Sequence, residues 1–574
     1  MKKLWSFVKG FEIQMVLAPL FKMLEASFDL FVPLVVANII NVGIMNQDTT
    51  YMIQQVLLLV LLAVLGLTAS AIAQYFSANA SVGITTRMRQ SLFEHIQSFS
   101  FTQLDHLTTS TLVTRLTSDI NQVQTGLNMG LRLLLRSPFV VFGSVIMAFL
   151  INRNAGFVFL VAVPVLTAVV LFLMLKSIPL FSKVQKLLDQ VTQKVRENLL
   201  GVRVIRAFCI EKQEVQSFTD KNAELTDMNL YVGKLSALMN PATYLLINLA
   251  TIVLIYVGAI QVNIGSIDQG DVVALYNYMA QMIVELVKLA SLMITLNKAI
   301  ACANRVEQIF EIEPDTNTNI TNSSCTKDGS ISFKHVSFTY EGSGEEALSD
   351  INFELGPKQT LGIIGGTGSG KSTLVQLITN FYQATSGEVS IDGVDIKEMS
   401  RQQILDKVGI VMQKAVLFKG TIEENLRWGN ENATEEEIGE ALEVSQSKEF
   451  VESKGLDAMI EQGGKNLSGG QRQRLTIART LLKKPEILIL DDSASALDYA
   501  TDAKLRKAIR HLSDQPTTII VSQRASSIMQ ADQILVLDDG KVAGIGTHEQ
   551  LLNDCKVYQE IYESQYPDAK KVGA

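Results

Sequence analysis

The strongest constraint on this chain is a series of long apolar stretches in its first 312 residues. A helix that crosses the core of a bilayer needs roughly 20 mostly apolar residues. Because a backbone in lipid must satisfy its own hydrogen bonds, such stretches are expected to be helices. The sequence therefore predicts a membrane α-helical bundle of six transmembrane helices over residues 1–312, near 14–40, 53–79, 132–152, 156–177, 241–262 and 272–298.

Charge changes along the chain at the end of this region. Residues 1–312 hold 23 Lys and Arg against 19 Asp and Glu, whereas the remaining residues hold 27 against 39. The segment 313–329 between them is polar, aperiodic and rich in Asn, Thr and Ser, which is typical of a linker. We expect a water-soluble domain over residues 330–574. Its acidic balance and lack of a basic stripe give no support to nucleic-acid binding.

Basic residues also predict how the membrane domain is oriented. Two long segments between apolar stretches, about 80–131 and 178–240, carry most of the Lys and Arg of this region. The positive-inside rule places them, and with them both termini, in the cytoplasm of a multi-pass protein of the cytoplasmic (plasma) membrane. Their apolar spacing is helical, so we expect long cytoplasmic extensions that turn near 100–108 and 207–213 and dock there on a soluble domain.

Five charged residues fall inside the predicted spans. Lys22, Glu25 and Asp29 lie in the first span, and Glu285 and Lys288 lie in the sixth. Charges at membrane depth are costly, so these side chains are expected to face a cavity or partner helices. Two interpretations remain open: they pair with one another, or they contact a substrate.

A glycine-rich loop in the soluble domain predicts a nucleotide site. It follows the apolar strand pattern TLGIIG and precedes the helical pattern LVQLITNFY, which is the setting that G-x-x-x-x-G-K-[ST] requires. Backbone N–H groups of such a loop converge on phosphate oxygens, while its Lys reaches the β- and γ-phosphates and its Ser binds Mg²⁺. The predicted ATP-binding residues are Gly365, Gly366, Thr367, Gly368, Ser369, Gly370, Lys371, Ser372 and Thr373.

A second apolar run, Ile487–Leu490, ends in the paired carboxylates Asp491 and Asp492. A strand that delivers an acidic side chain beside a phosphate loop holds Mg²⁺, usually through water. We assign this role to Asp491, together with Ser372.

Between these two elements lies Leu467-Ser468-Gly469-Gly470-Gln471, which resembles the signature of the ATP-binding cassette (ABC) transporters. The resemblance covers the whole chain and is that of an ABC exporter half-transporter, with an α/β P-loop nucleotide-binding domain after the membrane domain. It implies ATP and Mg²⁺ as cofactors and two further roles. Tyr340 would stack on adenine, and Gln413 would link Mg²⁺ to the membrane domain. Ser495, Ala496, Leu497 and Asp498 match the family's D-loop.

The resemblance also implies a dimer. In this family two nucleotide-binding domains close head to tail, and each ATP lies between the phosphate loop of one domain and the signature of the other. A chain with one such domain therefore needs a second half-transporter.

Two positions depart from the family pattern. The general base after the Mg²⁺ aspartate is usually Glu, but here it is Asp492, and the usual switch histidine is replaced by Gln523. Because an ångström-scale misplacement can cost about 10²-fold in rate, we expect this site to bind ATP and hydrolyse it slowly. With an intact signature, this predicts a heterodimer whose other chain carries the Glu and the His.

The function expected from these features is ATP-driven export of amphipathic or hydrophobic, multidrug-like small molecules across the cytoplasmic membrane. Alternatives are a slow homodimeric exporter of lipid or peptide, and an ATP-gated channel or regulatory membrane protein.

Overall fold

The computed structural model describes residues 4–314 and 329–566, and of residues 170–171, 173–178, 236, 238–240 and 242–243 only the backbone. The chain forms two compact units. The helical unit comprises residues 1–97 and 109–313, and the α/β unit comprises residues 98–108 and 314–574. Most of the predicted linker 313–329 lies outside the described residues.

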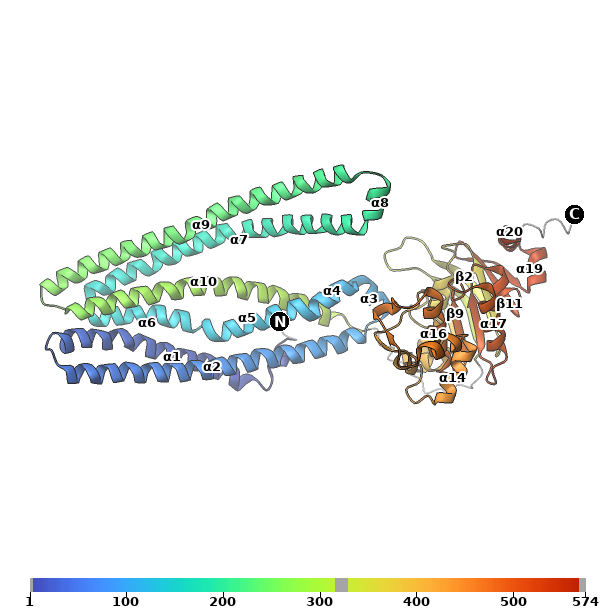
Figure 1. The fold of residues 1–574 in the computed structure, drawn as a ribbon, viewed down its shortest axis with the longest axis horizontal. Coiled ribbons are helices and arrows are strands. Elements are labelled where there is room, and N and C mark those ends of the chain that lie inside the picture. The colour runs from blue at the N-terminus through green and yellow to red at the C-terminus, as the bar shows by residue number, and fades with distance from the viewer. Residues whose placement is uncertain (1–3, 315–328, 567–574) are drawn as a thin grey trace. The chain divides into compact units, whose positions relative to one another are not determined.

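Long helices make up the helical unit (Figure 1). In chain order they are η1 Leu4–Val8, α1 Glu12–Asn38 with the π-helical turn η2 Ile39–Ile44, α2 Thr49–Gln97, α4 Thr109–Thr114 with η3 Arg115–Asp119, α5 Ile120–Leu133, α6 Arg136–Ile151, α7 Arg153–Leu200, α8 Val202–Ala207, α9 Glu211–Asn263 and α10 Gln269–Glu311.

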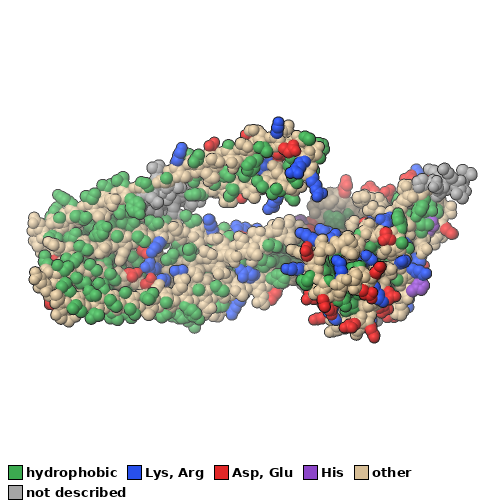
Figure 2. Space-filling view, viewed as in Figure 1, with side chains coloured by type: hydrophobic (Ala, Val, Ile, Leu, Met, Phe, Trp, Pro, Cys, Tyr) green, Lys and Arg blue, Asp and Glu red, His purple; other side chains and the backbone are tan. Residues whose placement is uncertain are grey.

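The predicted membrane bundle is confirmed. Among the residues that the structure describes, five helical segments are long and apolar enough to cross a membrane: Glu12–Ile44, Thr49–Gln97, Thr109–Ile151, Tyr244–Asn263 and Gln269–Glu311. The predicted fourth span falls in α7, whose described apolar part is Arg153–Val169. Hydrophobic side chains cover much of this unit on the face shown in Figure 2. Apolar residues such as Leu57 and Leu61 on α2 are more than half exposed, as expected of side chains that face lipid.

The long segments that separate the spans are helical extensions, and their turns differ slightly from the prediction. The first segment continues α2 to Gln97 and returns through α4 and α5. The second continues α7, turns through α8 at Val202–Ala207 and returns along α9, so this turn begins before the predicted 207–213. Gly201 caps the end of α7 and begins the turn, because its N–H still bonds the carbonyl of Glu197 (2.8 Å).

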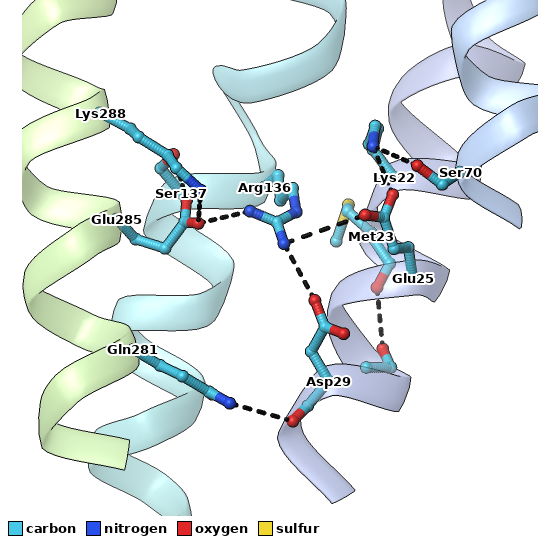
Figure 3. A network of polar contacts seen from close by, with 11 residues as sticks. Lys22, Met23, Glu25, Asp29, Ser70, Arg136, Ser137, Gln281, Glu285 and Lys288 are labelled. Carbon is cyan, nitrogen blue, oxygen red and sulfur yellow. Dashed lines mark hydrogen bonds and ion pairs between the residues drawn. The ribbon is translucent and has the colours of Figure 1, made fainter. Parts of the chain in front are cut away.

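A connected set of ion pairs joins α1, α6 and α10 at the depth of the apolar spans (Figure 3). Its centre is Arg136, the first residue of α6, whose side chain is 13% exposed. Its guanidinium donates from Nη1 to Glu285 Oε1 at 2.5 Å and from Nη2 to Asp29 Oδ2 at 2.9 Å. Lys288 Nζ also donates to Glu285 Oε1 at 2.9 Å, and Ser137 Oγ donates to Glu285 Oε2 at 2.8 Å.

The same set continues on α1 and reaches α2. Lys22 Nζ donates to Glu25 Oε2 at 2.5 Å and to Ser70 Oγ at 2.9 Å. Glu25 lies 4.0 Å from Arg136 Nη2. Three cations thus face three carboxylates, and all five charges that the sequence places in the spans have an ionic partner. The structure shows the pairing that the sequence left open, and it adds Arg136 as the shared cation.

The α/β unit contains two main sheets. The six-stranded sheet has the order β12-β11-β3-β10-β9-β6, and the four-stranded antiparallel sheet has the order β2-β1-β4-β5. Their strands are β1 Ile331–Phe338, β2 Leu348–Leu355, β3 Thr360–Gly365, β4 Ser386–Ile391, β5 Val394–Asp395, β6 Val408–Val411, β9 Ile487–Asp491, β10 Thr517–Val521, β11 Gln533–Asp538 and β12 Lys541–Gly546. A small pair, β7 Gly420–Thr421 and β8 Met459–Ile460, lies apart.

Helices cover the sheets and are begun by side-chain caps. Ser400, Thr421, Thr434 and Ser468 each form a capping box with the residue three positions on. The helices are α11 Lys371–Ile378, α12 Arg401–Lys407, α13 Ile422–Arg427, α14 Glu435–Val444, α15 Lys448–Lys454, α16 Gly469–Leu481, α17 Tyr499–Arg510, α18 Ala525–Ile528, α19 His548–Asp554 and α20 Lys556–Gln565, with short 3-10 turns η4 Ile396–Glu398 and η5 Gln462–Gly464.

The parallel strands β11, β3, β10, β9 and β6 place the functional edge of this unit. Every residue of β3, β9 and β10 is buried, which explains why these segments are unbroken apolar runs. Parallel strands end at the same edge of a sheet, and in such folds ligands bind at that edge. The residues that follow β3, β6, β9 and β10 therefore lie together.

The short helix α3 Phe101–Leu107 belongs to the α/β unit although it interrupts the membrane domain in sequence. The ring of Phe101 stacks on Phe381 with centroids 4.2 Å apart, and the Tyr382 hydroxyl bonds the Asp105 carboxylate. A pocket of about 780 Å³ lies between this helix and the β1 end, and Tyr340 forms part of its lining. The first docking element expected near 100–108 is thus present as a helix.

Replacing Arg136 should destabilise the helical unit strongly. The substitution Arg136→Met leaves Glu285 and Asp29 without their shared cation, and breaking a buried pair in this way costs about 3–5 kcal/mol. The matched control is Lys288→Met, because the Lys288 side chain is 45% exposed and an exposed pair contributes about 1 kcal/mol or less. Thermal unfolding of the chain in lipid nanodiscs measures both, and equal losses would contradict the central role of Arg136.

Removing the aromatic contact of α3 should loosen this helix. A stacked pair contributes about 0.5–1.5 kcal/mol beyond its buried area, so Phe101→Ala is expected to speed amide exchange over residues 98–107 roughly two- to tenfold. Hydrogen-exchange mass spectrometry of the full chain measures this. The control Phe208→Ala, at a residue 73% exposed, should leave that exchange unchanged. Unchanged exchange in Phe101→Ala would show that α3 is held by other contacts.

Candidate nucleotide site

The loop from Gly365 to Gly370 connects β3 to α11 and needs its glycines. Gly368 and Gly370 have φ of +86° and +91°, a region that glycine enters without strain. At Gly370 a Cβ atom would also lie 2.6 Å from Leu348 Cδ2, and at Gly365 it would lie 2.2 Å from the carbonyl oxygen of Leu537. The glycines therefore allow the loop to turn tightly over the end of the sheet.

Lys371, the first residue of α11, lies within this loop. Its Nζ donates to the carbonyl oxygens of Gly365 (2.9 Å) and Gly366 (2.5 Å) and lies 3.3 Å from Ser369 Oγ. Burial lowers the pKa of this ammonium, while the nearby Asp492 and Asp491 oppose the shift. The side chain is thus held beside the loop's amides at the start of a helix, which is where phosphates bind in proteins.

Asp491 ends β9 and faces the same loop. Its Oδ1 accepts a hydrogen bond from Ser372 Oγ at 3.4 Å, and burial raises the pKa of its carboxyl. Burial raises the pKa of Asp492 too. The two carboxylates outnumber the one ammonium beside them, so the pocket can accept a further cation. The oxygen atoms of Ser372 and Asp491 are ligands of the kind that Mg²⁺ prefers.

No cluster of three or more His, Cys, Asp or Glu that would hold a metal occurs within residues 4–314 and 329–566. Mg²⁺ in nucleotide sites is bound by one or two protein oxygens, substrate phosphates and water, and Ser372 Oγ and Asp491 Oδ1 are two such oxygens 3.4 Å apart. The residues present therefore fit Mg²⁺ bound together with a nucleotide.

Two further predicted residues reach the pocket from the ends of β6 and β10. Gln413 follows β6, and its Nε2 donates to Asp492 Oδ2 at 3.3 Å. Gln523 follows β10 and is exposed in the pocket. The pocket has a volume of about 300 Å³ and is lined by Tyr340, Ala347, Thr367, Gly368, Ser369, Gly370, Lys371, Ser372, Thr373, Gln413, Asp491, Asp492, Val521, Ser522 and Gln523.

Tyr340 stands just beyond β1 at one side of this pocket. Its hydroxyl bonds Thr373 Oγ1 (3.0 Å) and Gln376 Oε1 (3.1 Å), both on α11. Its ring contacts Phe338 edge-on with centroids 4.7 Å apart. These contacts hold the Tyr340 side chain against α11 and Phe338 at the side of the pocket.

The signature segment Leu467–Gln471 does not line this pocket among the described residues. Ser468 caps α16, because its Oγ accepts from the N–H of Gln471 at 3.2 Å. A Cβ atom on Gly470 would lie 3.1 Å from the carbonyl oxygen of Ala496, so the D-loop residues Ser495–Asp498 pack directly behind the signature. The signature segment and the pocket beside Lys371 are thus separate places in the α/β unit.

Sequence reasoning missed Arg524, which connects these two places. Its guanidinium donates to the carbonyl oxygens of Ala494 (3.3 Å) and Leu497 (3.2 Å) and lies 4.9 Å from the Tyr499 ring centroid. The residue directly follows Gln523, so the loop after β10 is tied to the D-loop. An arginine in a loop carries no periodic signal, and its position beside Gln523 was the sole local indication.

As a unit, the pocket has groups for each part of a Mg²⁺-bound nucleoside triphosphate. Loop amides and Lys371 suit the phosphates, Ser372 and Asp491 suit the cation, and Tyr340 suits the base. Asp492 and Gln523 line the same pocket.

Comparison with known proteins agrees with this reading. The model of the ABC transporter transmembrane region matches residues 15–286, and the ABC transporter model matches residues 348–495. The ABC transporter ATP-binding protein YfiB of Bacillus subtilis is 37% identical over 99% of each chain. The ATP-dependent lipid A-core flippase of Vibrio vulnificus is 26% identical over 98% of this chain and 97% of its own.

A solved structure shares the fold. The structure of a bacterial Atm1-family ABC exporter with ATP bound superposes with a TM-score of 0.79 at 24% identity, covering 97% of this chain and 99% of that one. Both halves of the chain match in the same order, and a relative matches over nearly its full length. The chain therefore belongs to the ABC transporter family, with the domain arrangement of an exporter half-transporter.

Proposed function

We propose that this chain is one subunit of a heterodimeric, ATP-driven exporter in the cytoplasmic membrane, with both termini in the cytoplasm. Its own phosphate loop binds ATP at a site of low hydrolytic activity. Its signature segment Leu467–Gln471 completes the active site of a different partner chain. The observation that carries the proposal is the placement of Asp492 and Gln523, rather than Glu and His, at the pocket beside an intact phosphate loop.

Asp492 is too short for the task of a general base in this site. Its side chain has one methylene less than Glu, which withdraws the carboxylate by roughly 1.5 Å. Its Oδ2 also accepts the hydrogen bond from Gln413. The backbone of Asp492 is fixed as well, because its N–H bonds the carbonyl of Val521 (3.0 Å). A carboxylate that is shorter and held in this way orients an attacking water poorly, and such misplacement costs about 10²-fold in rate.

Gln523 retains one function of a histidine and loses another. Its amide can donate a hydrogen bond to a phosphate oxygen, but it cannot exchange a proton near neutral pH as an imidazole can. The pair of replacements therefore favours a site that holds the terminal phosphate over one that cleaves it.

In this account the chain's own residues bind and orient ATP. Ser372 and Asp491 would hold Mg²⁺, which would neutralise phosphate charge when bound with the nucleotide. The loop amides and Lys371 hold the phosphates, and Tyr340 supports the base. Gln413, in the segment after β6, is hydrogen-bonded to Asp492, so a movement of Asp492 moves this segment. Helix α3, stacked through Phe101 on the α/β unit, is the element through which closure of the nucleotide domains acts on the membrane helices.

The substrate class proposed is an amphipathic or hydrophobic small molecule. The spans are apolar, and their charges at membrane depth are paired among themselves around Arg136. A relative named as a lipid A-core flippase supports an amphipathic substrate.

Restoring the two family residues should raise hydrolysis. In the double variant Asp492→Glu with Gln523→His, two copies brought together in one nanodisc by a fused dimerisation tag combine complete phosphate-loop residues of one copy with the intact signature of the other. We expect its rate of ATP turnover in lipid nanodiscs to exceed that of the wild type by about 10²-fold. Phosphate release at saturating Mg²⁺ and ATP measures this.

The control adds Lys371→Ala to the double variant and should abolish the gain by weakening ATP binding. Equilibrium binding of ATP to the wild-type chain is expected to persist, because the loop and Tyr340 are complete. Brisk turnover by the wild-type chain alone, with no gain in the double variant, would contradict the impaired site and favour a homodimer.

A further inference from the structure

The C-terminal helix α20 is a fixed part of the α/β unit. Its Tyr558 is fully buried, and its hydroxyl lies 2.7 Å from His548 Nδ1. Burial raises the pKa of Tyr558 to about 12 and lowers the pKa of His548. Tyr558 also packs in one core cluster with Ala525 and Ile528 of α18. The first turn of α20 therefore packs in the same core as α18.

The last residue of α20, Gln565, holds the loop that carries Gln523. Its Oε1 accepts the N–H of Ala525 at 2.8 Å, and its Nε2 donates to the carbonyl oxygen of Gln523 at 2.7 Å. Ala525 is the first residue of α18. The side chain of the N-cap residue Arg524 accepts no hydrogen bond from the first backbone N–H groups of this helix. The side-chain amide of Gln565 thus provides a hydrogen-bond acceptor for the N–H of Ala525 and a donor for the carbonyl of Gln523, the residues on either side of Arg524.

This contact bears on the nucleotide pocket. The side chain of Gln523 has no hydrogen-bond partner within residues 329–566, so its position over the pocket follows from its backbone. On the other side of the loop, Ser522 is anchored by its N–H to the carbonyl of Ile363 on β3 (3.0 Å). The loop is therefore held at both ends, by β3 on one side and by α20 on the other.

We propose that Gln565 is a positioning residue: its side-chain amide fixes the backbone at Gln523 and Ala525 and so sets where the Gln523 side chain meets the terminal phosphate. Through Arg524 the same contact steadies the D-loop at Ala494 and Leu497. The proposal rests on the role given to Gln523 in the proposed function. It makes the C-terminal helix part of the apparatus that retains ATP.

The first test measures the loop itself in the full chain. Loss of a hydrogen bond of ordinary strength should speed amide exchange over residues 522–528 roughly fivefold in Gln565→Ala. Gln565→Glu keeps the oxygen that accepts from Ala525 and should restore most of the protection. The matched control is Gln559→Ala on the same helix, whose amide donates to the carbonyl oxygens of Leu552 and Asn553, and it should leave this exchange unchanged.

The second test separates positioning from a general structural role. The slowly hydrolysed analogue ATPγS, bound with Mg²⁺, should leave Gln565→Ala roughly fivefold faster than wild type, whereas release of ADP, which lacks the terminal phosphate, should not change. In a background of Gln523→Ala the effect of Gln565→Ala should vanish, because both act through one side chain. Equal acceleration of ADP release, additive effects of the two substitutions, or unchanged exchange over 522–528 would each overturn the proposal.

Failure of the proposed role of Gln523 has a different result. If Gln523→Ala alone leaves ATPγS release unchanged while Gln565→Ala speeds it, the retention of phosphate by Gln523 is wrong and so is positioning through it. If neither substitution affects ATPγS release but loop exchange responds to Gln565→Ala, Gln565 holds the loop without a part in nucleotide binding, which also overturns the proposal.

Discussion

The alignment of the carboxyl ends of the parallel strands at one edge of the sheet determines which residues of the α/β unit lie together. In the order β3-β10-β9-β6, each strand ends in a different functional residue or loop: the phosphate loop, Gln523, Asp491 with Asp492, and Gln413. The buried cores of β3, β9 and β10 hold these ends in register. A shift of one strand would separate groups that bind one ligand, so the apolar strands determine the chemistry indirectly.

The same edge explains why one chain is half a catalytic assembly. The phosphate loop and the signature helix α16 lie at different places in the unit, and the loop after β10 joins them through Arg524 and the D-loop. In the proposed function, the pocket built around Lys371 retains ATP, and the signature serves a partner. Gln565 extends this connection to α20, because its amide bonds the backbone of both Gln523 and Ala525.

Motifs with fixed local spacing could be predicted from the sequence, and long-range contacts could not. Gly365–Thr373 and Asp491 stand out because a strand, a loop and a helix must follow in that order. The membrane spans stand out because lipid demands long apolar stretches. By contrast, Arg136 meets Glu285 across 149 positions, and Phe101 meets Phe381 only after folding. Nothing in the local pattern around Arg524 or Gln565 marks them, since their partners are backbone carbonyls and amides brought close by tertiary packing.

In the proposed heterodimer this chain works beside a different half-transporter, because its own site has Asp492 and Gln523 while its signature is intact. Native mass spectrometry of the chain, extracted with lipid from its own membranes, tests this pairing. We expect a complex of one 63.2 kDa chain and one chain of different mass that carries Glu and His at the matching positions. A complex of twice 63.2 kDa as the sole assembly would contradict the heterodimer.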